Sequence, residues 1–150
     1  MTAATSPQPE LGLLLRLAHQ RAAKAFSDAL HPLGIEGRHY GVLLTLARRG
    51  PLTQSQLMVE LGNDKSSMVR TVDDLERLGL CQRSPVPGDR RARAVDMTAT
   101  GRERFTAATT VAQQVTDHLF ASLTDEELAT LRDLLTRFID VDPRAARAGT

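Results

Sequence analysis

Two short helical segments joined by a glycine turn, followed directly by an arginine-rich hairpin, constrain this fold more than any other feature. Together they occupy residues 52–101. Thr53 and Gln56 have the spacing of a capping box, so a helix is expected to begin there. Gly62 is suited to end that helix, and Asn63 and Asp64 are both suited to cap the next one. So short a link predicts two helices packed as a helix-turn-helix.

The second of these helices, predicted over 65–78, has two chemically different faces. At about 100° per residue, one face carries Met68, Val72 and Leu75. The N-terminal residues of the opposite face are Lys65, Ser66, Ser67 and Arg70. A recognition helix contacts base edges through its N-terminal residues, and hydroxyls and cations suit that task. Farther along, where such a helix would leave the groove, Asp73 is expected to pair with Arg77 four residues on. An ordinary amphipathic helix with a polar outer face is the alternative.

A hairpin is predicted after this helix, with strands at 80–83 and 91–97 around the turn sequence SPVPGD. The return strand alternates, with Val95 and Met97 on one face. The segment from Arg83 to Arg93 contains four arginines, Arg83, Arg90, Arg91 and Arg93, against one acid, Asp89. The whole chain has a net charge of only +1, so the positive charge is local. An exposed arginine at such a tip suits a narrow DNA minor groove, although a solvated charged face is the simpler interpretation of charge alone.

The flanking segments are predicted to be one-sided helices. Apolar residues recur at helical spacing over 10–31 until Pro32 and Gly34, and residues before Pro9 are expected to fray. A helix over 36–48 is expected to bury Tyr40, Leu43, Leu44, Leu46 and Ala47. A long helix follows from 101 or 102 to about 122. A second capping box, Thr124 with Glu127, then opens a last helix that ends at Pro143.

The apolar stripes of the first helix and of the last two helices suggest mutual burial across a two-fold dimer. A helical core within one chain is the alternative that remains open. At 150 residues the chain is most simply one domain with an aliphatic core, because hydrophobic residues make up 41% of it and aromatic residues only 3%. The sequence has no apolar run long enough to cross a bilayer and no secretory signal, so a cytoplasmic location is expected.

Few residues suggest catalysis, metal binding or redox chemistry. The chain has one cysteine, Cys81, which is interpreted as a small buried hydrophobe. Its four histidines are scattered without the spacing of metal ligands. We find no catalytic set, so we expect neither an enzyme nor a cofactor.

Taken together, these segments resemble the MarR family of winged helix-turn-helix regulators over nearly the whole chain. The most specific match is the hairpin sequence DRRARAVDMT followed by Gly101, which is similar to the family signature "D-x-R, hydrophobic, Leu-Thr-x-x-Gly". Met97 stands where leucine is commoner. The segments DKSSMVR and DLERLGL also resemble the family's recognition helix.

The resemblance implies a mainly α fold with a small β-wing. It implies one domain over 1–150, with a winged DNA-binding part over about 35–100 and dimerisation helices over about 9–31 and 101–140. It also implies a homodimer that binds pseudo-palindromic double-stranded DNA as a transcriptional regulator, most often a repressor. The implied DNA-contacting residues are Thr53, Gln54, Lys65, Ser66, Ser67, Arg70, Asp89, Arg90, Arg91 and Arg93. In this scheme Arg91 enters the minor groove and the carboxylate of Asp89 holds its guanidinium.

Family members often respond to a small phenolic or carboxylic acid that binds between the dimerisation helices and the winged part. The candidate ligand residues here are Arg16, His19, Gln20, His39 and Tyr40. For His39 a histidine with satisfied hydrogen bonds at an interface is the competing interpretation. A helical dimer that binds a ligand or protein without binding DNA is the competing function, and the two functions differ over the role of Arg91.

Overall fold

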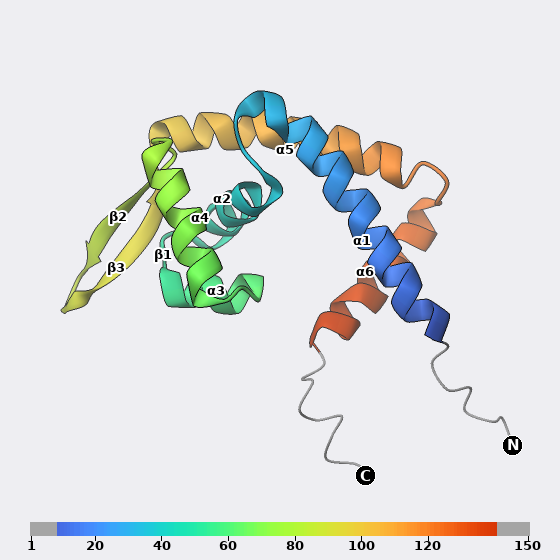
Figure 1. The fold of residues 1–150 in the computed structure, drawn as a ribbon, viewed down its shortest axis with the longest axis horizontal. Helices are drawn as coiled ribbons and strands as arrows, with labels where there is room; N and C mark the ends of the chain where they lie inside the picture. The colour runs from blue at the N-terminus through green and yellow to red at the C-terminus, as the bar shows by residue number, and fades with distance from the viewer. Residues whose placement is uncertain (1–8, 141–150) are drawn as a thin grey trace, which may run out of the picture. The chain divides into compact units, whose positions relative to one another are not determined.

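The computed structural model describes residues 9–140, and the expectations for residues before Pro9 and for Pro143 lie outside this range. The elements in chain order are α1 (Pro9–Leu30), the short 3-10 helix η1 (His31–Leu33), α2 (Gly37–Arg49), β1 (Leu52–Thr53), α3 (Gln54–Leu61), α4 (Lys65–Arg77), β2 (Cys81–Val86), β3 (Asp89–Met97), α5 (Ala99–Leu119) and α6 (Asp125–Asp140) (Figure 1). The chain divides into two compact units, and the boundary along the chain falls between Val115 and Thr116, within α5. The mainly helical fold with a small β-wing is as predicted.

The sheet has three antiparallel strands in the order β1-β3-β2. Cys81 pairs with Met97 and Arg83 with Val95, which sets the register of the predicted hairpin. β1, in which Leu52 also pairs with Val95, was not predicted from the sequence. A strand of two residues is too short to show the alternation by which strands are recognised.

The core of the first unit lies where α2, α3 and α4 pack against the inner face of the sheet and the start of α5. It contains the predicted residues Met68, Val72, Leu75, Val95 and Met97. In α2, Leu43 and Leu46 are buried as expected, but Ala47 is exposed, so its predicted burial is wrong. Val42 and His39 are buried instead, because the inward face of α2 is centred on the 39–42–43–46 positions.

The start of α5 is locked to the end of α4 by the Thr-x-x-Gly segment. Thr98 N–H donates to the carbonyl of Leu80 over 3.0 Å, and its hydroxyl donates to the carbonyl of Gly79 over 2.6 Å. The N–H of Gly101 donates to that same hydroxyl oxygen over 3.0 Å. A Cβ atom at position 101 would lie 1.9 Å from the carbonyl oxygen of Leu80, so only glycine fits there.

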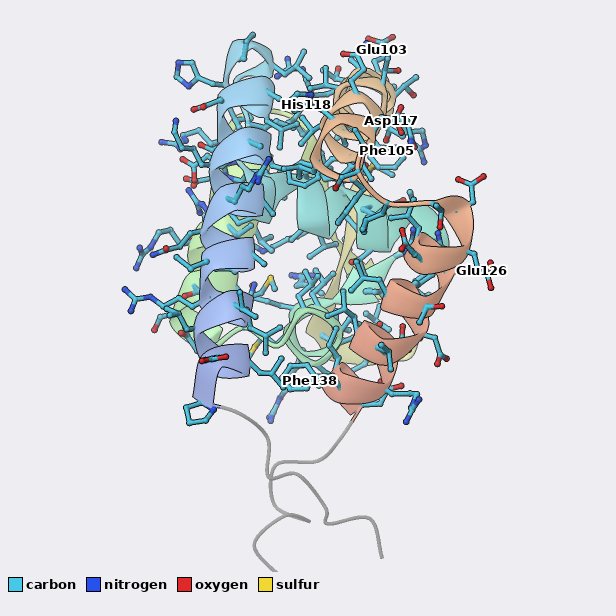
Figure 2. The ribbon with its side chains drawn as sticks, turned by 90° about the vertical axis from the view of Figure 1, so that its right-hand side faces the viewer. Glu103, Phe105, Asp117, His118, Glu126 and Phe138 are labelled. Atoms are coloured by element: carbon cyan, nitrogen blue, oxygen red, sulfur yellow. The ribbon has the colours of Figure 1, made fainter. Side chains whose placement is uncertain are left out.

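Exposed apolar side chains are concentrated on two helices. On α1 they are Leu11, Leu13, Leu14, Leu15 and Leu17, and on α6 they are Leu134, Leu135, Phe138 and Ile139. Figure 2 shows Glu126 and Phe138 near the two ends of α6. The capping box at the start of α6 is confirmed, since Thr124 N–H donates to the carboxylate of Glu127 and Glu127 N–H to the hydroxyl of Thr124. None of the described helices has the combination of length and apolar character that crossing a membrane requires.

Candidate nucleic-acid interface

The turn between α3 and α4 is held by the caps that the sequence predicts. Gln56 N–H donates to Thr53 Oγ1 over 3.2 Å, and Thr53 N–H donates to Gln56 Oε1 over 2.9 Å. Gly62 ends α3 with a positive φ of 64°. Asp64 accepts the N–H of Ser67 over 2.7 Å and the Ser67 hydroxyl over 3.2 Å. These bonds orient the first turn of α4, and they hold the pKa of Asp64 below its usual value.

The first two turns of α4 present an exposed basic surface. Lys65, Ser66, Ser67 and Arg70 are all exposed there. Within the described part of the chain, neither Lys65 nor Arg70 forms an ion pair with a carboxylate. The hydroxyl of Ser67 already donates to Asp64, so Ser66 is the serine whose hydroxyl is not held by the cap. Helix N-termini also favour phosphate groups, because their N–H groups and dipole face the anion.

The acids of α4 pair differently from the prediction. The predicted pair of Asp73 with Arg77 is wrong, because Asp73 pairs with Arg83 of β2 over 2.6 Å. Arg77 pairs with Asp74 over 2.6 Å instead. The C-terminal half of α4 packs against β2, so the guanidinium of Arg83 reaches both Asp73 and Glu76. Arg83 is therefore neutralised at the base of the wing and does not add to its free positive charge.

The wing is the β2–β3 hairpin, which extends beside α4 (Figure 1). Its turn contains Gly88 with a φ of 82°, a conformation that favours glycine. The side chains of Arg90, Arg91 and Arg93 are exposed. The prediction that Asp89 holds the guanidinium of Arg91 is wrong. Asp89 Oδ1 accepts the backbone N–H groups of Arg91 over 2.9 Å and Ala92 over 3.3 Å, so the carboxylate shapes the turn and leaves the guanidinium free.

Thr53 and Gln54 lie at the N-terminal end of α3 and are both partly buried. The side-chain oxygen of Gln54 accepts a long hydrogen bond of 3.5 Å from Arg83. The structure thus connects the start of α3, the C-terminal half of α4 and the wing through Arg83. This connection joins positions 29 residues apart, so no local sequence pattern indicates it.

A cavity of about 570 Å³ lies in the first unit between α1 and α2. Of the predicted ligand residues, His19 and Tyr40 line it, whereas Arg16, Gln20 and His39 do not. Phe26, Leu30, Glu36 and Arg38 are among its other lining residues. The ring of Tyr40 stacks on Phe105 of α5 with centroids 5.9 Å apart, and its hydroxyl lies 3.3 Å from Thr109 Oγ1. The lining of the cavity therefore combines aromatic and aliphatic side chains with the charged residues Glu36 and Arg38.

His39 is buried below the cavity wall with both ring nitrogens in polar contacts. Nδ1 accepts the N–H of Glu36 over 2.9 Å, and Nε2 lies 3.4 Å from Asp74 Oδ2. Burial lowers the pKa of His39 despite the nearby Asp74 carboxylate. Arg38 next to it pairs with Glu36 and Asp74, and this guanidinium holds the pKa of both carboxylates below their usual values. Glu36, Arg38 and Asp74 were missed, because partners 36 residues apart leave no local pattern.

Cys81 is a small buried residue, as its sequence context suggests. Cys81 is buried, and that burial raises the pKa of its thiol to about 12, so it is not a reactive thiolate at neutral pH. Among residues 9–140, no three His, Cys, Asp or Glu side chains come together in a way that could hold a metal ion.

This fold and this surface define a winged helix-turn-helix protein with an exposed basic recognition helix and a basic wing. The model of the MarR family matches residues 33–92. The transcriptional repressor NicR of Pseudomonas putida is 30% identical over 136 residues, which cover 91% of this chain and 86% of NicR. The chain therefore belongs to the MarR family of transcriptional regulators.

Two solved structures resemble the chain over most of its length. A cysteine-to-serine mutant of MarR from Escherichia coli, complexed with operator DNA, has a TM-score of 0.80 and 27% identity, and covers 87% of this chain and 94% of that chain. BpsR of Bordetella bronchiseptica, whose DNA binding is regulated by 6-hydroxynicotinic acid, has a TM-score of 0.80 and 25% identity, and covers 87% of this chain and 99% of that chain.

Proposed function

We propose that the chain is a homodimeric, sequence-specific transcriptional repressor that binds double-stranded DNA and whose binding is modulated by a small phenolic or carboxylic acid. The DNA-binding part of this proposal rests on one observation: two exposed basic surfaces lie on the same compact unit. One is the start of α4 with Lys65 and Arg70, and the other is the wing with Arg91. Two regulators of the same family, the repressor NicR and the DNA-bound MarR, support this function.

In this proposal the start of α4 enters the major groove. Arg70 is suited to bidentate contact with a guanine edge, and Ser66 to either a base edge or a phosphate. Lys65, Thr53 and Gln54 meet backbone phosphates near the N-terminal ends of α4 and α3. Arg91 enters the minor groove, with Arg90 and Arg93 against the phosphates, while Ser67 and Asp89 hold the local backbone in place.

The exposed leucines of α1 and the apolar face of α6 are proposed as the dimer contact. Contiguous exposed apolar side chains on a small chain mark an interaction surface. A two-fold dimer presents its two recognition helices to half-sites about 34–36 Å apart, which makes the operator pseudo-palindromic.

The effector is proposed to occupy the cavity between α1 and α2. Its walls include Phe26, Leu30 and Tyr40, which suit an aromatic ring. Charged or polar contacts would come from Arg38 and His19, which line the cavity. Arg16, Gln20 and His39 do not line it and would lie outside direct contact with a ligand there. The ligand of BpsR, 6-hydroxynicotinic acid, belongs to this chemical class.

The substitution Arg91→Ala tests the DNA-binding part. We expect the affinity for a duplex selected from a random library to fall about tenfold or more, which corresponds to about 1.4 kcal/mol. The matched control is Arg132→Ala, which removes an exposed arginine of α6 and should leave the affinity unchanged. Binding is measured by anisotropy of labelled DNA, with light scattering to confirm the dimer.

Salt dependence gives a second measurement of the same proposal. Each neutralised phosphate contributes about −0.9 to the slope of log K against log salt. The wild-type slope should be steep, and Arg91→Ala should make it shallower. A flat slope, or an Arg91→Ala protein that binds like the wild type, would count against DNA binding and favour a helical dimer of another function.

A further inference from the structure

We propose that Arg38 transmits occupancy of the cavity to the recognition helix α4 by exchanging the carboxylate of Asp74 for the carboxylate of the ligand. This inference rests on the proposed function and names its regulatory contact. Arg38 lines the cavity between α1 and α2, and the same side chain is paired with Asp74 of α4. Arg38 therefore belongs to the lining of the cavity, and its guanidinium is bonded to the proposed recognition helix.

The guanidinium of Arg38 has a partner on each nitrogen. Nε donates to Glu36 over 2.8 Å, Nη1 to the hydroxyl of Thr71 over 3.3 Å, and Nη2 to Asp74 over 2.7 Å. Nε and Nη2 form the edge of the guanidinium that binds a carboxylate with two parallel hydrogen bonds. In this structure that edge is shared by two different carboxylates, neither of which has both bonds.

Asp74 connects α4 to α2. Its Oδ2 atom accepts from Arg38 and lies 3.4 Å from His39, while its Oδ1 atom accepts from Arg77 of α4 itself. In the described part of the chain, the ion pair between α2 and α4 is that of Asp74 with Arg38, and the 3.4 Å contact of Asp74 with His39 joins it to an imidazole that is neutral when Nδ1 accepts the N–H of Glu36. Replacement of Asp74 at Nη2 therefore removes the charged attachment of α4 to α2.

Glu36 is the carboxylate that a ligand displaces most easily. Its side chain is 63% exposed, so its charge returns to water at little cost, whereas Asp74 is only 19% exposed. A ligand carboxylate that replaces Glu36 accepts the hydrogen bond of Nε, and its second oxygen then lies next to Nη2. It then competes for Nη2 with Asp74, while the ring of the ligand lies against the apolar wall that includes Phe26 and Tyr40.

This exchange predicts competition between ligand and Asp74. If both need the same edge of Arg38, removing the Asp74 carboxylate strengthens ligand binding and at the same time removes the effect of ligand on DNA. Removing the Glu36 carboxylate also strengthens ligand binding, but the effect on DNA is retained. If the two carboxylates had only structural roles, their removal would not change the ligand affinity and the effect of ligand on DNA binding independently of each other.

The experiment uses the full-length protein with 4-hydroxybenzoate as the probe and 4-hydroxybenzamide as its uncharged isostere. Calorimetry without DNA gives the ligand affinity, and anisotropy gives the DNA affinity with and without saturating ligand. For the wild type we expect 4-hydroxybenzoate to weaken DNA binding about five- to 150-fold, the usual range of coupling between sites, and the amide to have no effect.

The variants separate the steps. Asp74→Asn should bind 4-hydroxybenzoate more tightly than the wild type, with little remaining effect on DNA. Glu36→Gln should bind it more tightly and keep the full effect. Arg38→Met should lose the preference for the acid over the amide. Asp133→Asn, which removes an exposed carboxylate paired within α6, is the control and should match the wild type.

Four results would overturn the inference. They are an Asp74→Asn protein that binds the probe no better, one that keeps the full DNA response, a wild type that binds acid and amide equally, and a wild type that binds neither. If Asp74→Asn does not fold, Arg38→Lys decides, since lysine keeps the charge without the two-bond edge and should bind the probe more weakly. DNA affinity without ligand tests the proposed function separately, and calorimetry tests the exchange even if no duplex binds.

Discussion

His39 shows how a single buried side chain can depend on pH. Its Nδ1 atom accepts the N–H of Glu36, so that nitrogen must be free of a proton. Burial lowers the pKa of His39 from its ordinary value of about 6.5. The unfolded chain then binds more protons than the folded chain just below that value, so the free energy of unfolding falls as the pH falls through this window.

We expect His39→Gln to remove this pH dependence. Glutamine has an oxygen that can accept the same N–H, and it does not titrate. Chemical denaturation between pH 7.5 and 5.5 should show a falling free energy of unfolding for the wild type and a smaller fall for the variant. The carboxylates of Glu36 and Asp74 have lowered pKa values, so their contributions are lost only at lower pH, below about 4. Parallel curves for the two proteins would contradict this role of His39.

Gly101 is a residue whose size alone matters. A methyl group there would lie 1.9 Å from the backbone oxygen of Leu80, and a backbone atom cannot rotate away. Gly101→Ala should therefore lower the free energy of unfolding by about 1–3 kcal/mol, the usual cost of overpacking. The measurement is urea denaturation followed by circular dichroism.

Gly41→Ala is the matched control, because a Cβ atom there would be 3.8 Å from Leu61, an ordinary contact. In the interior of α2 that change should be neutral or stabilising by up to about 1 kcal/mol. Equal effects of the two substitutions would mean that the contact with Leu80 relaxes without cost.

At the scale of elements, the position of the wing depends on an arginine that is paired with two carboxylates of α4. Arg83 of β2 pairs with Asp73 and Glu76, so it fixes the hairpin to the C-terminal half of α4. The angle between the wing and the recognition helix decides whether Arg91 and Arg70 can bind one duplex together. Within this hairpin, Arg83 therefore positions the wing, whereas Arg90, Arg91 and Arg93 supply its exposed positive charge.

Arg83→Met should weaken DNA binding several-fold through loss of this positioning. Hydrogen exchange of β2 and β3 amides should become faster, since a less restrained element opens more often. Arg91→Ala provides the comparison, because it should weaken DNA binding with unchanged exchange in the wing. Unchanged exchange in Arg83→Met would assign the arginine to direct contact with DNA.

At the scale of the whole molecule, assembly depends on faces that are exposed in the single chain. Phe138 of α6 is 62% exposed, and Figure 2 shows it near the end of that helix. In a monomer, changing such a residue alters stability by no more than about 0.5 kcal/mol. In a dimer that buries it, a charge at this position is costly.

Phe138→Asp should shift the protein from dimer towards monomer in analytical ultracentrifugation and weaken binding to a two-half-site duplex. Val59→Asp is the control, because Val59 is an apolar residue of α3 that is 84% exposed and lies outside the proposed contact. Dimers of equal stability in both variants would exclude this end of α6 from the interface.

The elements of the chain were largely predictable from the sequence, because they are determined by short-range chemistry. The capping residues Thr53, Asp64 and Thr124 begin helices as predicted, and Gly62 ends one. The alternation of Val95 and Met97 predicted the buried face of β3. Each of these features depends on residues within about four positions of one another, so the sequence alone carries the information.

The pairing of charges was decided by the tertiary structure. Asp73 pairs with Arg83 rather than Arg77, and Asp89 binds backbone N–H groups rather than a guanidinium. The attachment of α2 to α4 joins Arg38 to Asp74, 36 positions away. Long side chains at a surface reach many partners of opposite charge, and the closest one is known only after packing has placed the elements. The sequence by itself therefore determined which groups are available, and the packing of α2, α4 and β2 determined which of them meet.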